Sequence, residues 1–438
     1  MAETRLVSTP VDSPLQGALV MPGDKSISHR SLMFAAIADG TSELAGVLEG
    51  EDCLATADAM RAMGVPVSAT AHGRYTVTGR GLRGLAVPAS AIDLGNSGTG
   101  MRLMCGLLAA QSFGSTLIGD ASLSRRPMRR VTDPLVQMGA DILTEDGHAP
   151  IRIKPVPALS GIDYQLPVAS AQLKSALLIA GLFATSAVTV REPAVSRDHT
   201  ERMLASMGAD VTSQKGVVSI QPAQRLSAFQ LSVPSDLSSA AFFLVAASIV
   251  PGSALSLPAV GVNPTRDGVL RILQAMGADI RRDNERDCSG EPVADIHVSA
   301  TQLRGTSVDP SLVPLAIDEF PVLFVAAAVA TGQSHFAGLA ELRHKESDRI
   351  DAMVRGLRAL GVSVTEGEDW VTIDGGTISA GTVDSFTDHR IAMAFAVAGS
   401  VAQGPVHVRR PENIATSFPD FVELAAAAGM HLGFTEVS

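Results

Sequence analysis

Apolar residues recur along this chain with helical spacing in six places, and each time the pattern stops at a glycine and continues as a short apolar–polar alternation. Glycine adopts the left-handed conformation that closes a helix, and alternation is typical of a strand with one buried face. Each place therefore predicts a helix end followed by a strand. Three of the glycines, Gly139, Gly208 and Gly277, stand at equal intervals of 69 residues (139 to 208 to 277). The six segments are Arg61–Val67, Val136–Ile142, Leu204–Val211, Leu273–Ile280, Leu357–Val364 and Ala425–Leu432.

Six polar clusters run directly into apolar helical stretches, which is typical of helix starts. A helix start offers free backbone N–H groups and a partial positive charge. Several of them aimed at one cavity would bind an anion. The clusters are Asp24–Arg30, Asn96–Arg102, Ser170–Lys174, Asp236–Ala240, Asp318–Pro321 and Asp388–Arg390.

The repeats predict a mixed α/β protein in two lobes. Three repeats lie on each side of Ser232–Asp236, near the middle of the 438 residues. A repeat of this length is a small folded unit rather than a solenoid turn. The cleft between two such lobes is the expected ligand site.

The amino-acid composition of the chain disfavours some classes of binding partner. The net charge of −11 disfavours nonspecific binding to nucleic acid or to anionic membranes, so positive charge for an anionic ligand must be local. No apolar run reaches the roughly 20 residues of a membrane span, and Met1–Leu15 has neither a basic leader nor a signal-length apolar run. The three cysteines, Cys53, Cys105 and Cys288, lack CxxC spacing, which favours a reducing cytoplasm and no zinc site.

Two polar segments are candidates for the chemistry. In Pro22–Ser31, a helix beginning near Lys25 places Ser26 and Arg30 on one face. The alternative is a capped helix with solvated basic ends. In His344–Arg349, a helix with an inward stripe at Ile350, Val354 and Leu357 would carry Glu346 one turn upstream, where burial or neighbouring cations tune a carboxylate for proton transfer. The alternative is a surface ladder of salt bridges.

Arginines supply the local positive charge. Arginine favours a bidentate grip on carboxylate or phosphate. The densest patch is Arg125, Arg126, Arg129 and Arg130, and Arg390 lies at the last predicted helix start. Together they indicate a small, multiply anionic substrate.

Nine segments, in order and over essentially the whole chain, resemble the 5-enolpyruvylshikimate-3-phosphate (EPSP) synthases, also called 3-phosphoshikimate 1-carboxyvinyltransferases. The segments are Pro22–Arg30, Leu94–Arg102, Arg126–Met128, Ser170–Lys174, Arg197–His199, Ile317–Pro321, Lys345–Arg349, Asp388–Met393 and Ser417–Asp420.

The resemblance implies an inside-out α/β barrel in each of two lobes, built from six βαβαββ repeats, three per lobe. It implies an N-terminal lobe at residues 23–234 and a C-terminal lobe at residues 1–22 plus 235–438. The family transfers the carboxyvinyl group of phosphoenolpyruvate to the 5-hydroxyl of shikimate 3-phosphate, on the route to chorismate and aromatic amino acids. No metal, nucleotide or other cofactor is implied, and a cytoplasmic monomer is expected.

The resemblance also assigns site residues. It assigns shikimate 3-phosphate to Lys25, Ser26, Arg30, Ser170, Gln172, Arg197, Asp318 and Lys345. It assigns phosphoenolpyruvate to Lys25, Gly98, Arg126, Gln172, Arg349 and Arg390. Asp318 and Glu346 are the candidates for proton transfer, with Lys25 steadying charge.

Two positions depart from a common bacterial form of the family, and a third position, Gly98, concerns an inhibitor of the family. Thr416 replaces a lysine that contacts phosphoenolpyruvate, and Glu341 replaces an asparagine. Members of the family are inhibited by glyphosate, which occupies the phosphoenolpyruvate position, and a glycine at position 98 leaves room for it. The resemblance therefore implies competitive inhibition by glyphosate, and loss of this inhibition in Gly98→Ala.

Two other functions remain as alternatives. The related transferase acting on UDP-N-acetylglucosamine typically carries a reactive cysteine near the position of Arg125–Arg130, and this chain has none there. A non-catalytic phosphosugar or nucleic-acid binding module is disfavoured by the net charge and by the scarcity of aromatic residues for base stacking.

Overall fold

The computed structural model describes residues 3–437, which divide into two compact units. Unit 1 comprises the residues up to Pro22, Pro234–Arg286 and the residues from Pro292 onward. Unit 2 comprises Gly23–Val233 and Asp287–Glu291. The short segment Asp287–Glu291 belongs to unit 2, whereas the sequence grouped it with the C-terminal lobe. Within that unit, Nδ1 of the buried His199 lies 2.7 Å from Oε1 of Glu291.

Unit 2 contains three four-stranded sheets with one common order, in which the first two strands are parallel and the later neighbours antiparallel. The sheets are β14 (Gln230–Ser232), β3 (Thr41–Ala45), β5 (Arg74–Thr78), β4 (Val67–Ala71); β6 (Ile92–Asp93), β7 (Ser115–Ile118), β9 (His148–Lys154), β8 (Asp141–Glu145); and β10 (Asp163–Gln165), β11 (Val188–Arg191), β13 (Val217–Ile220), β12 (Val211–Gln214). The helices are α1 (Lys25–Ala36), α2 (Glu51–Ala62), α3 (Gly98–Leu108), α4 (Arg129–Gln137), α5 (Ala171–Gly181) and α6 (His199–Ser206), with the 3-10 turn η1 (Leu123–Arg125).

Unit 1 repeats this arrangement in two complete sheets and one of three strands. The sheets are β2 (Gln16–Ala18), β15 (Ala254–Gly261), β17 (Glu291–Ser299), β16 (Asp279–Cys288); β21 (Gly381–Asp384), β22 (Val406–Arg409), β1 (Glu3–Thr9), β23 (His431–Val437); and β18 (Gln333–Ala337), β20 (Trp370–Asp374), β19 (Ser363–Glu366). In the third sheet, parallel bridges from Arg304 to Thr331 and from Ser307 to His335 stand where the others have a first strand. The helices are α7 (Leu237–Ile249), α8 (Gly268–Ala275), α9 (Val313–Ala316), α10 (Phe320–Val329), α11 (Arg349–Ala359), α12 (His389–Gly399) and α13 (Phe421–Ala428), with the 3-10 turns η2 (Pro310–Leu312), η3 (Ala340–His344) and η4 (Glu412–Thr416).

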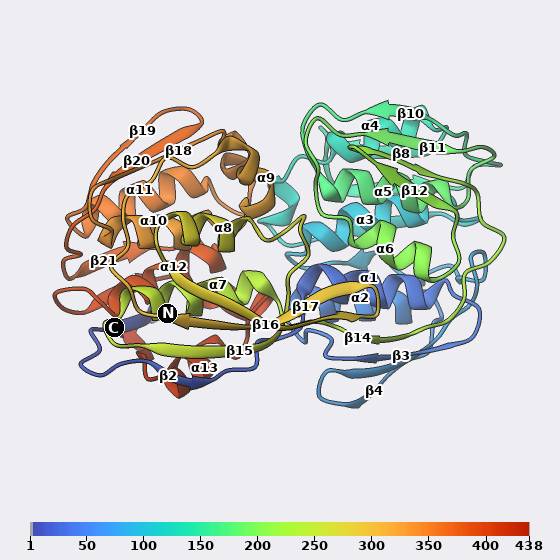
Figure 1. The fold of residues 1–438 in the computed structure, drawn as a ribbon. Helices are drawn as coiled ribbons and strands as arrows, with labels where there is room; N and C mark the ends of the chain where they lie inside the picture. Colours follow the sequence, from blue (N-terminus) through green and yellow to red (C-terminus); the bar gives the residue numbers. More distant parts are fainter. Residues whose placement is uncertain (1–2, 438) are drawn as a thin grey trace. The chain divides into compact units, whose positions relative to one another are not determined.

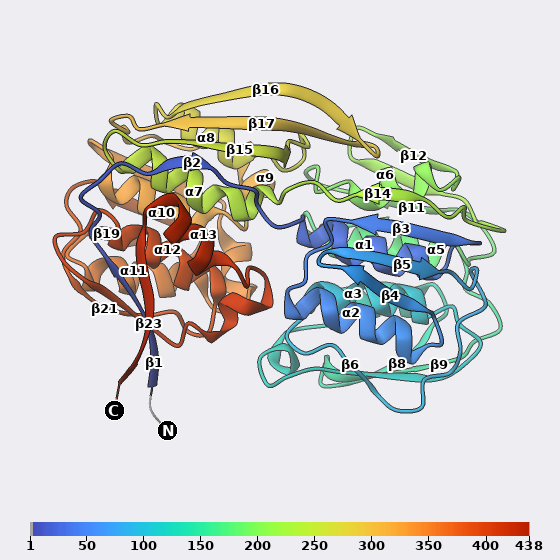
Figure 2. The same cartoon turned by 90° about the horizontal axis from the view of Figure 1, so that it is seen from below.

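Each unit has its own hydrophobic core, to which its largely buried helices contribute. In unit 1, α7, α10 and α12 contact one another and lie side by side in Figures 1 and 2. The sequence of α10, FPVLFVAAAV, contains no polar face, so burial on every side is its stable environment. This packing leaves the helix ends, rather than the helix faces, to carry polar side chains.

The six helix ends predicted at glycines and the six helix starts predicted at polar clusters are confirmed. All six glycines after the helices, from Gly64 to Gly429, have left-handed φ angles between 79° and 99°. All six polar clusters coincide with the starts of α1, α3, α5, α7, α10 and α12. Five of these starts are capped by a side chain, and only that of α10, at Glu319, is not. Among the helices of residues 3–437, none is both long enough and apolar enough to cross a membrane.

Candidate functional site

The predicted site residues are divided between the two units, and apart from Arg30, inside α1, they lie at or just before helix starts. Unit 2 holds Lys25, Ser26, Arg30, Gly98, Arg126, Ser170, Gln172 and Arg197, and unit 1 holds Asp318, Lys345, Glu346, Arg349 and Arg390.

Lys25 is the first residue of α1, and the helix start fixes its direction. Oδ1 of Asp24 accepts a hydrogen bond from the amide of Ile27 at 2.8 Å and caps the helix. The ammonium of Lys25 pairs with Oδ2 of Asp52 on α2. Asp52 was not predicted, because nothing in its local sequence separates it from other acidic residues in a first helical turn.

Arg30 lies one turn further along α1 and is buried. Its guanidinium donates to Oγ1 of Thr200 at 2.7 Å, to Oγ of Ser175 at 2.8 Å and to the carbonyl of Ser26 at 2.9 Å. These acceptors are neutral oxygens, so they orient the guanidinium without cancelling its charge. Burial lowers the pKa of Arg30 to about 10, which still leaves it cationic at neutral pH. A buried, oriented cation of this kind is suited to binding an anion.

Gly98 and Arg126 meet at the start of α3. The guanidinium of Arg126, which is buried, occupies the space beside Gly98, such that a Cβ on residue 98 would lie 2.4 Å from Nη1. Of the four clustered arginines, Arg126 alone is buried, whereas Arg125 and Arg129 are exposed and Arg130 is half-buried. The patch therefore supplies one cation at this helix start rather than four.

Gln172 is oriented from both ends of its amide. Nη1 of Arg102, a buried residue of α3, donates to Oε1 at 2.5 Å, and Nε2 donates to Oγ1 of Thr99 at 2.8 Å. Ser170 caps α5 by accepting from the amide of Leu173, which leaves its hydroxyl hydrogen for another acceptor. Arg102 lay inside a predicted motif, but its contact with Gln172 spans 70 residues and has no sequence signal.

A buried ion cluster supports the segment that carries Arg197. Nζ of Lys174 lies 2.9 Å from Glu192 and 2.7 Å from Glu201, and it also donates to the carbonyl of Ser196 at 3.2 Å. Burial opposes the charge, but Glu201 and Glu192 raise the pKa of Lys174 above its ordinary value. The cluster ties the segment before Arg197 to α5.

In unit 1, Arg349 is the centre of the site. Its fully buried guanidinium contacts three carboxylates: Oδ2 of Asp388 at 2.8 Å, Oε2 of Glu346 at 2.6 Å and Oδ1 of Asp318 at 3.3 Å. Burial alone would lower the pKa of Arg349, but the three carboxylates together raise it. The guanidinium is permanently charged, and it fixes both predicted proton-transfer groups.

Two further cations surround Asp318. Nζ of Lys345 lies 3.1 Å from its Oδ1, and Nη1 of Arg390 donates to its backbone carbonyl at 3.0 Å. Arg390 also pairs with Oε1 of the buried Glu319 at 3.5 Å. All five predicted residues of unit 1 are therefore brought together.

One structural detail of the prediction is wrong. Glu346 was placed on an inward helical stripe, but α11 begins only at Arg349, with Asp348 as its N-cap. Glu346 precedes the helix and reaches Arg349 from a non-helical segment. The stripe at Ile350, Val354 and Leu357 is buried as predicted. The side chain of Asp348 accepts from the amide of Asp351 and starts the helix at Arg349, three residues after Glu346.

Asp388 was not among the predicted site residues, although it contacts two of them, Arg349 and Arg390. It caps α12 by accepting from the amide of Arg390 at 2.9 Å, and the same carboxylate holds Arg349 and accepts from Ser347 at 3.0 Å. Burial opposes its ionisation, but Arg349 holds the pKa of Asp388 below its ordinary value. Asp388 thus positions both Arg349 and Arg390.

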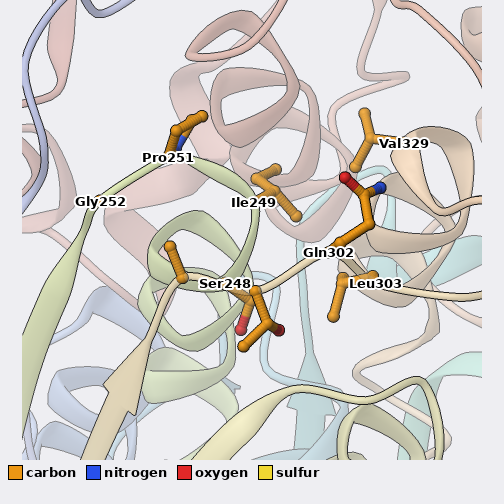
Figure 3. A pocket seen from close by; sticks show the side chains of 9 residues that line it. Ser248, Ile249, Pro251, Gly252, Gln302, Leu303 and Val329 are labelled. Atoms are coloured by element: carbon orange, nitrogen blue, oxygen red, sulfur yellow. The ribbon is translucent and has the colours of Figure 1, made fainter.

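One surface hollow of unit 1 lies away from these residues. It has a volume of about 340 Å³ and lies at the C-terminal ends of α7 and α10, between Ser248, Gln302 and Val329 (Figure 3). The predicted residues lie at the opposite, N-terminal end of α10. None of them lines this hollow.

A second acidic group is part of the frame of unit 2. Ligand atoms of Asp198, His199 and Glu291 lie within 4.8 Å of one another. Asp198 pairs with Arg202 at 2.9 Å, and His199 pairs with Glu291. These contacts hold the start of α6 against the segment Asp287–Glu291.

Comparison with known proteins identifies the family of the chain. The family model for EPSP synthase (3-phosphoshikimate 1-carboxyvinyltransferase) matches residues 11–424. The chain belongs to the EPSP synthase family. This confirms the predicted family and its transferase activity in the shikimate pathway.

Individual EPSP synthases agree over nearly the full length. The 3-phosphoshikimate 1-carboxyvinyltransferase of Xanthomonas campestris is 55% identical over 419 residues, which cover 95% of this chain and 96% of the relative. That of Xylella fastidiosa is 55% identical over 421 residues, covering 96% and 93%. The solved EPSP synthase of Acinetobacter baumannii is 48% identical, with a TM-score of 0.89 and coverage of 99% and 100%. The enolpyruvyl transferase NikO of Streptomyces tendae, 17% identical with a TM-score of 0.79 and full coverage of both chains, shares the mixed α/β fold.

Proposed function

We propose that this chain joins phosphoenolpyruvate to the 5-hydroxyl of shikimate 3-phosphate and releases phosphate. The observation that carries the proposal is the arrangement around Arg349, where Asp318 and Glu346 are both held on one buried guanidinium beside Lys345. The reaction needs two opposed proton transfers among highly charged substrates. Carboxylates fixed among cations meet that need, because the cations offset repulsion while the carboxylates move protons.

Binding of shikimate 3-phosphate is assigned to the group predicted for it. The buried guanidinium of Arg30, oriented by neutral oxygens, supports its role as the main anion contact. The full set is Lys25, Ser26, Arg30, Ser170, Gln172, Arg197, Asp318 and Lys345.

Phosphoenolpyruvate is assigned to cations that other residues hold in place. Arg126 lies against Gly98, Asp388 holds the guanidinium of Arg349, and the guanidinium of Arg390 donates to the carbonyl of Asp318. The full set is Lys25, Gly98, Arg126, Gln172, Arg349 and Arg390.

The reaction is an addition followed by an elimination. In the addition, the 5-oxygen bonds to C2 of phosphoenolpyruvate and gives its proton to a carboxylate, while the methylene carbon C3 receives a proton from an acid. In the elimination, C3 loses a proton, the C2=C3 double bond returns, and the bond from C2 to the phosphate oxygen breaks. Asp318 and Glu346 are the proton-transfer groups, and Lys25 stabilises negative charge on the phosphate. The steps balance with side chains as the proton carriers, so we propose no cofactor.

The finer architecture is part of the same proposal. The common strand order of the sheets supports six βαβαββ repeats, three in each of two inside-out α/β barrels. The lobes correspond to residues 23–234 and to residues 1–22 plus 235–438, apart from Asp287–Glu291. We further propose that the enzyme acts as a cytoplasmic monomer, in keeping with its three free cysteines, and that glyphosate competes with phosphoenolpyruvate.

Phosphate release tests the function. Purified protein is mixed with phosphoenolpyruvate and either shikimate 3-phosphate or UDP-N-acetylglucosamine. We expect phosphate only with shikimate 3-phosphate. Release only with the nucleotide sugar would replace the proposal by the related transferase, and no release with either would favour a binding protein.

A further inference from the structure

Two consecutive residues before the last helix start have a backbone conformation that side chains normally prevent. Phe386 and Thr387 have φ angles of 53° and 59°. In this left-handed region the Cβ atom approaches a backbone carbonyl oxygen, and a β-branched residue such as threonine is disfavoured most. They directly precede Asp388, the cap of α12. A strained turn persists only where the surrounding structure holds it.

The first half of the turn is held by Asp384 and Arg410. Oδ1 of Asp384 accepts from the amide of Phe386 at 2.8 Å and from Nε of Arg410 at 2.8 Å. The guanidinium of Arg410 lies 5.2 Å from the centre of the Phe386 ring, within the range of a cation–π contact. Backbone and ring are thus held by one ion pair.

The second half is held from η4. Nδ2 of Asn413 donates to the carbonyl of Thr387 at 2.5 Å. The carbonyl of Asn413 accepts from Oγ1 of Thr416 at 2.7 Å, and Thr416 is 5% exposed. A chain of hydrogen bonds therefore leads from Thr416 through Asn413 to the peptide that precedes Asp388.

We propose that Asn413 and Thr416 are positioning residues for the phosphoenolpyruvate cations. By holding Thr387 left-handed, they fix Asp388, and Asp388 in turn fixes Arg349 and the start of α12 at Arg390. At the position where a common form of the family has a lysine, the buried hydroxyl of Thr416 acts through the backbone instead of through charge. The inference rests on the proposed roles of Arg349 and Arg390.

The test removes the Asn413 donor and restores the turn by another route. In Asn413→Ala, we expect KM for phosphoenolpyruvate to rise roughly fivefold to tenfold, the usual effect of a lost hydrogen bond to a half-buried carbonyl. The dissociation constant for shikimate 3-phosphate stays unchanged. Asparagine adopts left-handed φ far more readily than threonine, so adding Thr387→Asn recovers most of the loss. Asn413→Asp, which keeps the shape but cannot donate, should behave as Asn413→Ala does.

A matched control and a second readout separate this inference from the proposed function. Gln333→Ala removes an amide hydrogen bond to Asp374 on an exposed sheet edge and leaves KM unchanged. Hydrogen exchange across residues 384–392 reports the turn without turnover, and we expect faster exchange in Asn413→Ala and restored protection with Thr387→Asn. If the wild type is inactive but this exchange pattern is found, the proposed enzymatic function is refuted and the positioning role of Asn413 still holds. Unchanged exchange and KM in Asn413→Ala, or equal weakening of both substrates without rescue, would refute the positioning.

Discussion

The guanidinium of Arg126 occupies the place of a side chain at Gly98, with Nη1 only 2.4 Å from where a Cβ would stand. In Gly98→Ala the guanidinium must move by about 1 Å, and a displacement of that size costs up to about 100-fold in a binding or catalytic group. We expect a higher KM for phosphoenolpyruvate and a larger loss of glyphosate inhibition. Steady-state kinetics with glyphosate titrated against phosphoenolpyruvate measure both.

A glycine without close neighbours serves as the control for that substitution. A Cβ on Gly114 would meet its nearest atom, the carbonyl oxygen of Ile153, at 3.6 Å, so Gly114→Ala should leave both constants unchanged. If Gly98→Ala keeps wild-type inhibition, the Arg126 side chain accommodates the methyl group without consequence, and the spatial account is wrong.

Asp388→Asn should destabilise unit 1 and make its free energy of unfolding less sensitive to acid. The substitution leaves the buried Arg349 with one carboxylate fewer, and loss of a buried partner costs about 3 kcal/mol or more. Because the pKa of Asp388 is lowered in the folded state, its contribution is complete above the unfolded value of about 3.9 and is lost as pH falls below it. Urea unfolding of both proteins should show a constant gap at neutral pH that narrows below about pH 4. A gap that grows on acidification would contradict the pairing.

Glu346→Gln should lower kcat far more than it changes affinity. Glutamine still accepts a hydrogen bond from Arg349 but carries no proton between substrates, and loss of general acid–base catalysis costs about 10²–10⁴-fold. Quenched-flow measurement of phosphate release gives the chemical step, and KM for phosphoenolpyruvate reports the binding. Glu368→Gln, in an exposed turn nearby, is the control. A Glu346→Gln enzyme with near-normal kcat would leave Asp318 as the only candidate of the pair.

Lys174→Met should unfold unit 2 more easily without removing a substrate contact. Two buried carboxylates, Glu192 and Glu201, would lose their common partner, at a cost of about 3–5 kcal/mol. The pKa of Lys174 is raised in the folded state. Its contribution to the stability of unit 2 is therefore complete below about pH 10.4, the ordinary pKa of lysine, and is lost as the pH rises further. Thermal melts measure the loss, which neutralising both glutamates as Glu192→Gln and Glu201→Gln should partly reverse. Lys154→Met, at a surface pair 3.7 Å from Asp141, should change little.

The helix ends at glycines and the helix starts at polar clusters could be predicted because their signals are local. A glycine after an apolar stripe, as at Gly208, requires a left-handed backbone, and a serine or aspartate before one, as at Ser170, accepts from the first free amides. These rules depend on a few neighbouring residues. They hold in both units regardless of what surrounds the helix.

The partners of the charged groups could not be predicted, because contacts between distant segments determine them. Arg102 reaches Gln172 across 70 residues, and Arg349 reaches Asp388 across 39. The error at Glu346 has the opposite origin, since a local feature, the N-cap Asp348, starts the helix at Arg349, after Glu346. The sequence therefore indicated which groups matter, and the fold decided which of them are held together.

The position of β1 has a consequence for the order in which the chain folds. β1 lies between β22 and β23, with Leu6 opposite both Val408 and Phe434, so β1 cannot complete its pairing until residues 406–437 have been made. The three sheets of unit 2 have all their strands once Ser232 has been made. On the ribosome, these three sheets can therefore form early, while β1 stays without its partners until residues 406–437 have been made. The strand carries the polar Thr4 and the charged Arg5, and charged side chains disfavour pairing of an exposed strand with other chains.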